Sequence, residues 1–572
     1  MRRFPLATFA LLVATSIVSC DNSTTTTTST MPQEEPRPTI VEVTEAGDEI
    51  PTFELYELTV ALEAEYENPF DQREVKLDAV FTGPDGREMQ VPGFWDARSA
   101  WKIRFSAPIP GEWEYSAVVT DARGTSEPVS GTFSAVESDH HGYLYPGSWV
   151  DPNLSPRYFV YSDGTPWYGR GHADLRMSFG GLTEDGFVKM NAMKEIGENY
   201  EMWWPLWNHN FISNKYDDYD RAAVEMIDRV VREAEEYDIT LAYTIWQHQL
   251  LRTDKHPWQN DLWQRNGFSK LVTIEGFFVD PESLAWQENF YRYTIARWAY
   301  SRAIVMWQTM TEINGSEVYE ERDNWHERLN AYFQEHDPWR HPTTACGSGG
   351  YDWPEAHAVM DAPQMHVYEQ LTDDPTEATT FMAEWSRLMW EREAKPNWIG
   401  EWGMRGQQYY PEALHNSLWG TLGAGAAASP IEWNDQYGYG AFDEEMAADM
   451  ARFSEFIEGI PMAVYNPEAL EFTMNDPEVR GWGVVGTGGV IWIQDYSMEG
   501  LPVREQSAFE GMRSGAVIEV QNMMPGKWDV MPYDTWTGEW YDSFEIDCPE
   551  TGNCEIPLPD FHRDIALHVV HS

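Results

Sequence analysis

The segment KPNWIGEWGM, residues 395–404, is a short apolar run that ends on a carboxylate. Trp398 and Ile399 indicate a buried strand, and Gly400 leads directly into Glu401. A charged side chain is costly to bury unless it has a partner or a chemical task. The segment therefore poses a choice between a buried ion pair and a reactive carboxylate.

Similar apolar runs recur through the middle of the chain, and amphipathic stretches such as residues 220–238 and 283–301 separate most of them. In order, the runs are PWYGRGHADL (166–175), GENYEMWW (197–204), ITLAYTIW (239–246), AIVMWQTMTEI (303–313), PTTACG (342–347), APQMHVYE (362–369), NWIGEWG (397–403) and AASPIEW (427–433). Strand-like runs that alternate with helices predict an α/β fold, here a TIM (β/α)8 barrel over residues 138–460.

Polar and aromatic side chains gather at the C-terminal ends of these runs, where barrels hold their active sites. Two of them, Glu312 and Glu401, are the candidate catalytic residues. The candidate substrate contacts are His172, Trp204, His248, Thr311, Asn314, His366, Tyr368, Trp402 and Trp433. For each glutamate alone, an ordinary ion pair is the competing interpretation, and for each histidine a structural hydrogen bond.

Both flanks of this region are rich in short alternating strands with Gly and Pro between them. Residues 41–137 contain FELYELTVALEAEY (53–66) and EVKLDAVFTG (74–83), which predict an immunoglobulin-like β-sandwich. Residues 461–572 return to strand-like patterns and predict a C-terminal β-sandwich.

The N-terminus has the features of an export signal. Arg2 and Arg3 precede a short apolar stretch that ends in SIVSC, so residues 1–20 resemble a bacterial lipoprotein signal with Cys20 as the lipidated residue. The competing interpretation is an ordinary signal peptide with an incidental cysteine. The Thr- and Pro-rich residues 21–40 predict a tether. We therefore expect a location at the bacterial envelope, periplasmic or on the outer-membrane surface, with secretion as the alternative, and membrane contact only through the lipid.

Charge and aromatic content narrow the class of partner. The chain has 94 acidic and 39 basic side chains, a net charge of −55, which argues against a nucleic-acid partner and fits a saline, marine habitat. Its 28 tryptophans suit stacking on sugar rings, although any single one can simply fill a core.

The cysteines predict one crosslink and no metal. Cys548 and Cys554 bracket the short segment CPETGNC, which favours a local disulfide in an exported chain. Cys346 has the pattern of a small buried apolar residue rather than a nucleophile. Because the chain has neither CxxC nor HExxH, we expect no metal and no cofactor.

Two strand-end carboxylates are what a glycosidase requires. One donates a proton to the leaving oxygen, and the other attacks the anomeric carbon or activates water. A separation of about 5–5.5 Å gives retention of configuration, and about 6.5–9.5 Å gives inversion.

With these residues in place, the chain resembles the clan of retaining (β/α)8 glycosidases that includes cellulases, β-mannanases and β-galactosidases. The resemblance implies that Glu312 is the acid/base, protonated in the resting state, and that Glu401 is the nucleophile. It also implies that Tyr368 hydrogen bonds to the nucleophile, that His366 orients the site, and that Trp433 lies under the sugar. The layout resembles a bacterial group with an immunoglobulin-like N-terminal domain and an apiosidase-like C-terminal sandwich named for collagen binding; WDVMPYDTWTGEW (528–540) matches its ending.

Two features bear on the sugar. The clan usually has Asn before the acid/base, in contact with the sugar 2-hydroxyl, whereas this chain has Thr311 there and Asn314 after the glutamate. The loop QHQLLRTDKHPW (247–258) brings Arg252 and Lys255 to the active face, which suits an acidic or sulfated sugar or else an ordinary surface loop.

The sequence thus predicts a retaining glycoside hydrolase that cleaves a plant or algal polysaccharide or its oligosaccharides, with sulfated and acidic sugars among the candidates. The alternative is a non-catalytic glycan-binding lipoprotein built on a degenerate barrel.

Overall fold

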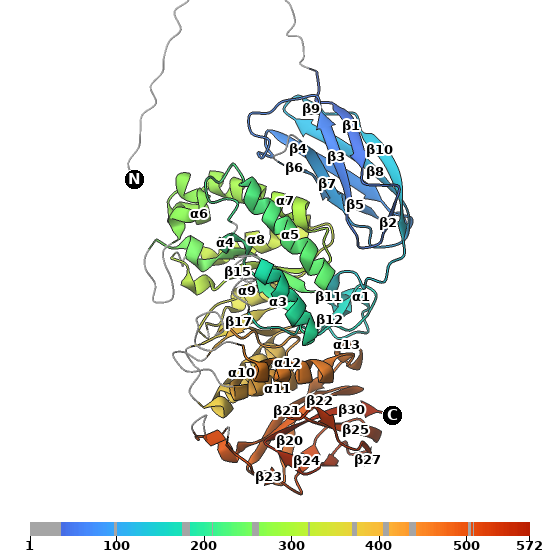
Figure 1. The fold of residues 1–572 in the computed structure, drawn as a ribbon, viewed down its shortest axis with the longest axis vertical. Coiled ribbons are helices and arrows are strands. Elements are labelled where there is room, and N and C mark those ends of the chain that lie inside the picture. Colours follow the sequence, from blue (N-terminus) through green and yellow to red (C-terminus); the bar gives the residue numbers. More distant parts are fainter. Residues whose placement is uncertain are drawn as a thin grey trace, which may run out of the picture.

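The computed structural model of the protein has three parts stacked along its long axis (Figure 1). The described residues are 36–96, 100–173, 184–208, 210–253, 262–317, 321–349, 351–368, 374–403, 411–433, 442–501, 505–506 and 508–572, without the side chains of 184–189 and 208. Cys20, the signal segment and most of the tether lie outside them. Within these ranges no helix is both long and apolar enough to cross a membrane.

The N-terminal part consists of two sheets that enclose a common core. One sheet has the order β1-β3-β7-β6 and the other β2-β10-β8-β4-β5, with β9 beside β8. The strands are β1 (Ile40–Glu45), β2 (Glu49–Pro51), β3 (Tyr56–Leu62), β4 (Val75–Thr82), β5 (Glu88–Pro92), β6 (Phe94–Trp95), β7 (Trp101–Phe105), β8 (Gly111–Asp121), β9 (Gly124–Thr125) and β10 (Val129–Val136). Every second residue of β4 is buried, and Phe81 stacks on Phe105 of the other sheet with ring centroids 3.9 Å apart.

The central part alternates parallel strands with helices, which confirms the α/β class. Its elements begin with β11 (Leu144–Pro146), α1 (Gly147–Val150), β12 (Phe159–Tyr161), α3 (Glu184–Glu195), β13 (Tyr200–Trp203), α4 (Pro205–Asn208), α5 (Arg221–Tyr237), β14 (Thr240–Gln247), α6 (Ile274–Val279), α7 (Pro281–Trp298) and β15 (Ile304–Thr311). They continue with α8 (Arg322–His336), β16 (Thr343–Ala345), α9 (Pro354–Val359), β17 (Gln364–Val367), α10 (Pro375–Arg392), β18 (Trp398–Trp402), α11 (Pro411–Ala424), α12 (Glu444–Ile457) and α13 (Met462–Tyr465).

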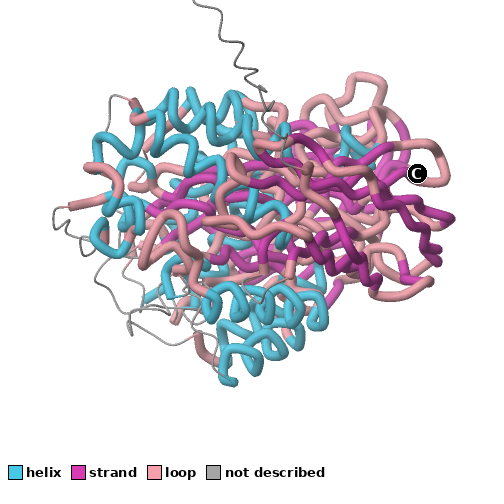
Figure 2. Tube along the Cα trace, turned by 90° about the horizontal axis from the view of Figure 1, so that it is seen from above, coloured by secondary structure: helices cyan, strands magenta, loops and turns pink. Residues whose placement is uncertain are grey.

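The parallel strands form two sheets, β13-β14-β15-β16 and β17-β18. All residues of β14 and β15 are buried, as expected for parallel strands covered on both faces. The described residues of the first and last predicted runs do not belong to either sheet. Isolated parallel bridges join the first run to the last, at Gly169 and Ala428, and the seventh to the last, at Trp402 and Glu432. Helices gather along two sides of the strands in the view from above (Figure 2).

The C-terminal part is again built of antiparallel strands. Its largest sheet has the order β19-β21-β22-β30-β25-β26, with β27 beside β25, and the smaller sheets are β20-β24-β28 and β23-β29. The strands are β19 (Glu468–Ala469), β20 (Phe472–Met474), β21 (Val479–Val485), β22 (Gly488–Asp495), β23 (Met512–Arg513), β24 (Val517–Val520), β25 (Gly526–Asp534), β26 (Glu539–Trp540), β27 (Phe544–Cys548), β28 (Cys554–Pro557), β29 (Phe561–His562) and β30 (Asp564–His571). A disulfide between Cys548 and Cys554 joins β27 to β28.

A buried ion network attaches the N-terminal sheets to the central part. Asp228 on α5 receives Arg104 of β7 at 2.9 Å and Arg297 of α7 at 2.7 Å. The indole of Trp298 donates to the same carboxylate. Burial opposes the charge of Asp228, but the two guanidinium groups hold its pKa well below the usual range.

A second buried network attaches the C-terminal sheet. His415 on α11 contacts Asp449 of α12 through Nδ1 at 2.8 Å and Asp564 of β30 through Nε2 at 3.1 Å. Trp536 donates to Asp564 and stacks on the His415 ring with centroids 3.8 Å apart. The helices α11 and α12 therefore meet the sheet through charge as well as apolar contact.

Candidate active site

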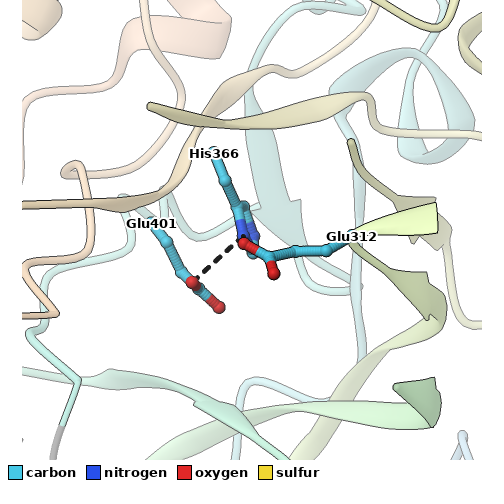
Figure 3. Close-up of side chains that lie close together, drawn as sticks. All are labelled: Glu312, His366 and Glu401. Atoms are coloured by element: carbon cyan, nitrogen blue, oxygen red, sulfur yellow. Dashed lines mark hydrogen bonds and ion pairs between the residues drawn. The ribbon is translucent and has the colours of Figure 1, made fainter. Parts of the chain in front are cut away.

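Two strand-end glutamates meet at one end of the parallel strands. Glu312 directly follows β15, and Glu401 lies in β18. One carboxylate oxygen of each, together with Nδ1 of His366 on β17, lie within 4.8 Å of one another. Glu312 is 6% exposed, Glu401 2% and His366 0%. Figure 3 shows the imidazole between the two carboxylates.

His366 is the shared partner of the pair. Its Nδ1 lies 3.0 Å from Oε1 of Glu312 and 3.1 Å from Oε2 of Glu401, and its Nε2 lies 3.1 Å from Sγ of Cys346. Burial alone would lower the pKa of His366, but the sulfur and the two carboxylates raise it well above its ordinary value. The cluster therefore favours a proton held between the two glutamates.

The backbone of Glu312 has a left-handed conformation that residues other than glycine seldom adopt, with φ 53° and ψ 55°. This left-handed residue ends the strand. Oε2 of Glu312 lies 3.2 Å from Nδ1 of His248. Burial opposes its charge, but the hydrogen bond from His366 and the charges of both imidazoles lower the pKa of Glu312 to about 2.

Glu401 is held on one oxygen only. The hydroxyl of Tyr368 donates to Oε2 at 2.6 Å, whereas Oε1 is buried and accepts no hydrogen bond from the described residues. Burial raises the pKa of Glu401 to about 7, against the lowering effect of His366 and of the Tyr368 hydroxyl. The pKa of Glu312 is thus lowered and that of Glu401 raised, which is the reverse of the expectation that Glu312 is protonated in the resting state. The reason is that Glu312 contacts two imidazoles, whereas Glu401 contacts only the one that it shares with Glu312.

The same three atoms are spaced closely enough to share a metal ion. The hydrogen bond from Tyr368 and the raised pKa of His366 instead favour a protonated, hydrogen-bonded cluster. The expectation of a metal-free, cofactor-free site stays a prediction.

Three other candidate residues, His172, Trp204 and Trp433, contact neighbouring protein groups. The ring of His172 stacks on Phe442 at 3.8 Å, and its Nδ1 lies 2.7 Å from Oε1 of Glu198. Trp204 and Trp433 lie with ring centroids 5.0 Å apart. The two rings come from the second and eighth predicted runs, so they form one aromatic group.

Three further candidates contact protein groups in ways the sequence did not indicate. Oγ1 of Thr311 lies 3.5 Å from Sγ of Cys346. The Asn314 amide exchanges two hydrogen bonds with the Ser348 backbone, at 2.8 and 3.0 Å. Trp402 is fully buried, so its ring packs in the core rather than on an open wall.

Gly400 and Arg252 both have close protein neighbours. A Cβ at Gly400 would overlap Oε1 of the buried Gln364, so a larger residue here requires that side chain to shift. Arg252 is 4% exposed and its guanidinium donates to the Gly315 carbonyl, so it does not reach out to a sugar. Lys255, the other cation of that loop, lies outside the described residues.

Sequence reasoning missed the part that Cys346 plays in the site. The residue was correctly expected to be buried, but its contact with His366 was not foreseen. A signal was present, because Cys346 follows β16, the fifth run, at the end where the other candidates lie.

Comparison with known proteins gives the following relatives. A family model described as a domain of unknown function (DUF5060) matches residues 49–120. No functionally curated protein matches the chain. A crystal structure described as a candidate glycoside hydrolase from Bacteroides vulgatus ATCC 8482 is 16% identical with a TM-score of 0.61, covering 92% of this chain and all of that one.

A family 5 glycoside hydrolase from the same organism is 12% identical with a TM-score of 0.49, covering 75% and 94% of the two chains. An endo-β-1,4-mannanase from Thermotoga petrophila is 11% identical with a TM-score of 0.40, covering 69% and 92%. The neighbours are thus described as glycoside hydrolases, and the likeness at a TM-score of 0.61 shows a shared fold.

Proposed function

We propose that this protein is a retaining glycoside hydrolase whose active site is the Glu312–His366–Glu401 cluster. The observation that carries the proposal is the buried pair of carboxylates with oxygens within 4.8 Å of each other, joined through one imidazole. This closeness suits the retaining geometry of about 5–5.5 Å between carboxyl groups better than the wider inverting geometry.

We further propose that the central part is a (β/α)8 barrel. Supporting contacts are backbone hydrogen bonds that link segments beyond the two sheets. Tyr200 N–H donates to the Arg170 carbonyl, His366 N–H to that of Gly347, and Ser429 N–H to that of Gly169. These bonds link the first run to the second, the fifth to the sixth and the eighth to the first, which supports a ring with Glu312 in the fourth run and Glu401 in the seventh.

The first chemical step follows from the two different environments. Oε1 of Glu401, which has no described partner, attacks the anomeric carbon while Oε2 is held by Tyr368. The bond to the leaving oxygen breaks, and that oxygen takes a proton from Glu312. His366 supplies this proton across the 3.0 Å contact with Oε1 of Glu312, so a low pKa of that carboxyl in the empty site is no obstacle.

The second step returns the site to its starting state. Glu312, now a carboxylate, removes a proton from water, and the water oxygen displaces Glu401 from the sugar. The proton on Glu312 is again shared with His366, and Glu401 regains its negative charge. No proton is gained or lost over the cycle apart from those of the hydrolysis itself.

For the substrate, we propose a plant or algal polysaccharide or its oligosaccharides. Trp204 and Trp433, with ring centroids 5.0 Å apart, are the residues for which we propose aromatic contact with a sugar ring. The proposal of a lipid-anchored envelope location rests on residues 1–40 of the sequence. The rival function, glycan binding without hydrolysis, has no need of two buried carboxylates that share a proton.

The test is a screen of the wild-type protein on neutral and sulfated polysaccharides, with Glu401→Gln and Glu312→Gln beside it. Glu235→Gln is the matched control, because Glu235 is a shielded glutamate on α5 that accepts a hydrogen bond from Ser301. We expect each site variant to lose about a thousandfold or more in kcat, and the control to keep its activity.

The stereochemistry of the first product, followed by NMR, tests retention separately. Wild-type activity that survives Glu401→Gln at a similar rate would contradict the mechanism, and an inverted product would contradict retention. Tight binding of a polysaccharide that is never cleaved would favour the rival.

A further inference from the structure

We propose that Cys346 is a positioning residue of this site: its sulfur holds both the His366 ring and the Glu312 backbone, and so directs His366 Nδ1 at the two carboxylates. The inference rests on the proposed function for its catalytic meaning. The geometry on which it stands is independent of any substrate.

The sulfur of Cys346, which follows β16, contacts residues of the neighbouring strands β15 and β17 or directly after them. Cys346 follows β16 and is fully buried. Its Sγ lies 3.1 Å from His366 Nε2 on β17, and it accepts the backbone N–H of Glu312, which follows β15, at 3.3 Å. The side-chain amide of Gln308 approaches the same atom at 3.8 Å. One atom thus contacts both members of the Glu312–His366 pair.

The contact with Glu312 stabilises an unusual backbone. Glu312 has the left-handed conformation, which a residue with a side chain keeps only when its surroundings impose it. The N–H of Glu312 donates to the sulfur, and the N–H of the next residue, Ile313, donates to the Cys346 carbonyl at 3.1 Å. Cys346 therefore holds two successive amides at the point where the chain turns to present the carboxylate.

The contact with His366 sets the direction of the ring. With Nε2 held by sulfur on one side, Nδ1 lies on the other side, against Glu312 and Glu401. Among the described residues, the titratable groups in contact with the ring are these two carboxylates and Cys346, while Tyr368 and His248 contact the carboxylates. Removing the sulfur would leave Nε2 without its acceptor and let the ring turn away from one carboxylate.

Because Cys346 lies behind the imidazole, it acts through His366 and Glu312 and has no contact with the reacting carbon in this scheme. A purely structural cysteine would leave the protonation of the site unchanged when replaced. A positioning cysteine would change it, since the sulfur is one of the groups that raise the pKa of His366.

The experiment compares Cys346→Ala with Cys346→Ser, in which a hydroxyl can still accept from Nε2. Thr309→Val is the matched control, because Thr309 is equally buried in β15 but its hydroxyl contacts His326 and the Thr344 carbonyl. For Cys346→Ala we expect kcat/KM to fall by about 10- to 100-fold, the effect of one lost hydrogen bond to a charged group.

We also expect the alkaline limb of its pH profile to move down by about one unit, because the shared proton is held less tightly. Cys346→Ser should recover most of both effects. The control should keep the wild-type profile shape.

A measurement without substrate separates the two proposals. In protein carrying labelled histidine, the NMR titration of His366 should move to lower pH in Cys346→Ala and only slightly in Cys346→Ser. An unchanged titration in Cys346→Ala overturns the positioning role, whatever the activity. A shifted titration in a protein that hydrolyses no glycan supports the positioning role and overturns the proposed function.

Discussion

The buried His415 makes the stability of the C-terminal sheet depend on pH in a way that can be calculated. Burial opposes its charge, but Asp449 and Asp564 raise the pKa of His415 to about 9 from its ordinary value of 6.5. A group whose pKa is raised on folding stabilises the protein fully below the unfolded pKa. That contribution is lost as pH rises from about 6.5 through about 9.

The size of the effect follows from the shift. A difference of 2.5 units, 9 minus 6.5, at about 1.36 kcal/mol each corresponds to about 3 kcal/mol of unfolding free energy. His415 is fully buried, so solvent screening does not reduce this value greatly. In His415→Gln the pH-dependent part should vanish. The difference between wild type and variant should therefore shrink by about 3 kcal/mol between pH 6 and pH 10.

The assay is hydrogen exchange of the β22 and β30 amides in increasing urea, measured at several pH values. Titrating groups away from His415, including the active-site cluster, contribute equally to both proteins and cancel in the difference. His571→Gln, at the partly exposed end of β30, is the control for the loss of an imidazole elsewhere in the sheet. Wild-type and His415→Gln free energies that run parallel from pH 6 to pH 10 would refute the reasoning.

Three further predictions concern single contacts. Tyr368→Phe removes the donor to Glu401 and should raise the pKa of that carboxyl further, so the acid limb of kcat/KM should move up by about one unit in a pH profile. Gly400→Ala should lower the free energy of unfolding in urea by about 1–3 kcal/mol, because its Cβ would overlap the Gln364 amide; Gln364→Ala in the same chain should restore part of the loss. Asp228→Asn removes the carboxylate that Arg104 and Arg297 share but leaves each its second partner, Glu57 or Asp96; it should cost about 1–3 kcal/mol, seen as earlier proteolysis of the N-terminal sheets.

The position of residues at strand ends explains why the sequence could bring three of the candidate residues together. Glu312, His366 and Glu401 were selected because each closes an apolar run, and parallel strands bring such ends together. The pairing of Tyr368 with Glu401 was implied by resemblance and is present as a 2.6 Å hydrogen bond. The boundaries of the three parts, at residues 137 and 460, stay predictions.

Contacts that depend on direction could not be predicted. A sequence pattern shows that Arg252 is charged but not that its guanidinium turns inward to a carbonyl. It shows that Cys346 suits a core but not that its sulfur faces His366, because that contact joins two strands whose register is set by the whole sheet. The pKa shifts of Glu312 and Glu401 both depend on their contacts with His366, so their directions could not be predicted from the sequence either.

The His415 network also constrains how such chains are rearranged during evolution or by protein engineers. Helices α11 and α12 supply His415 and Asp449, and the C-terminal sheet supplies Asp564 and the Trp536 ring. A cut at residue 460 would leave His415 and Asp449 on one fragment and Asp564 on the other. The charges of His415 and Asp564 would then be exposed to water without each other. The sheet should therefore be transferred together with α11 and α12. A foreign sheet can replace the native one only if it supplies a carboxylate in place of Asp564 to pair with His415.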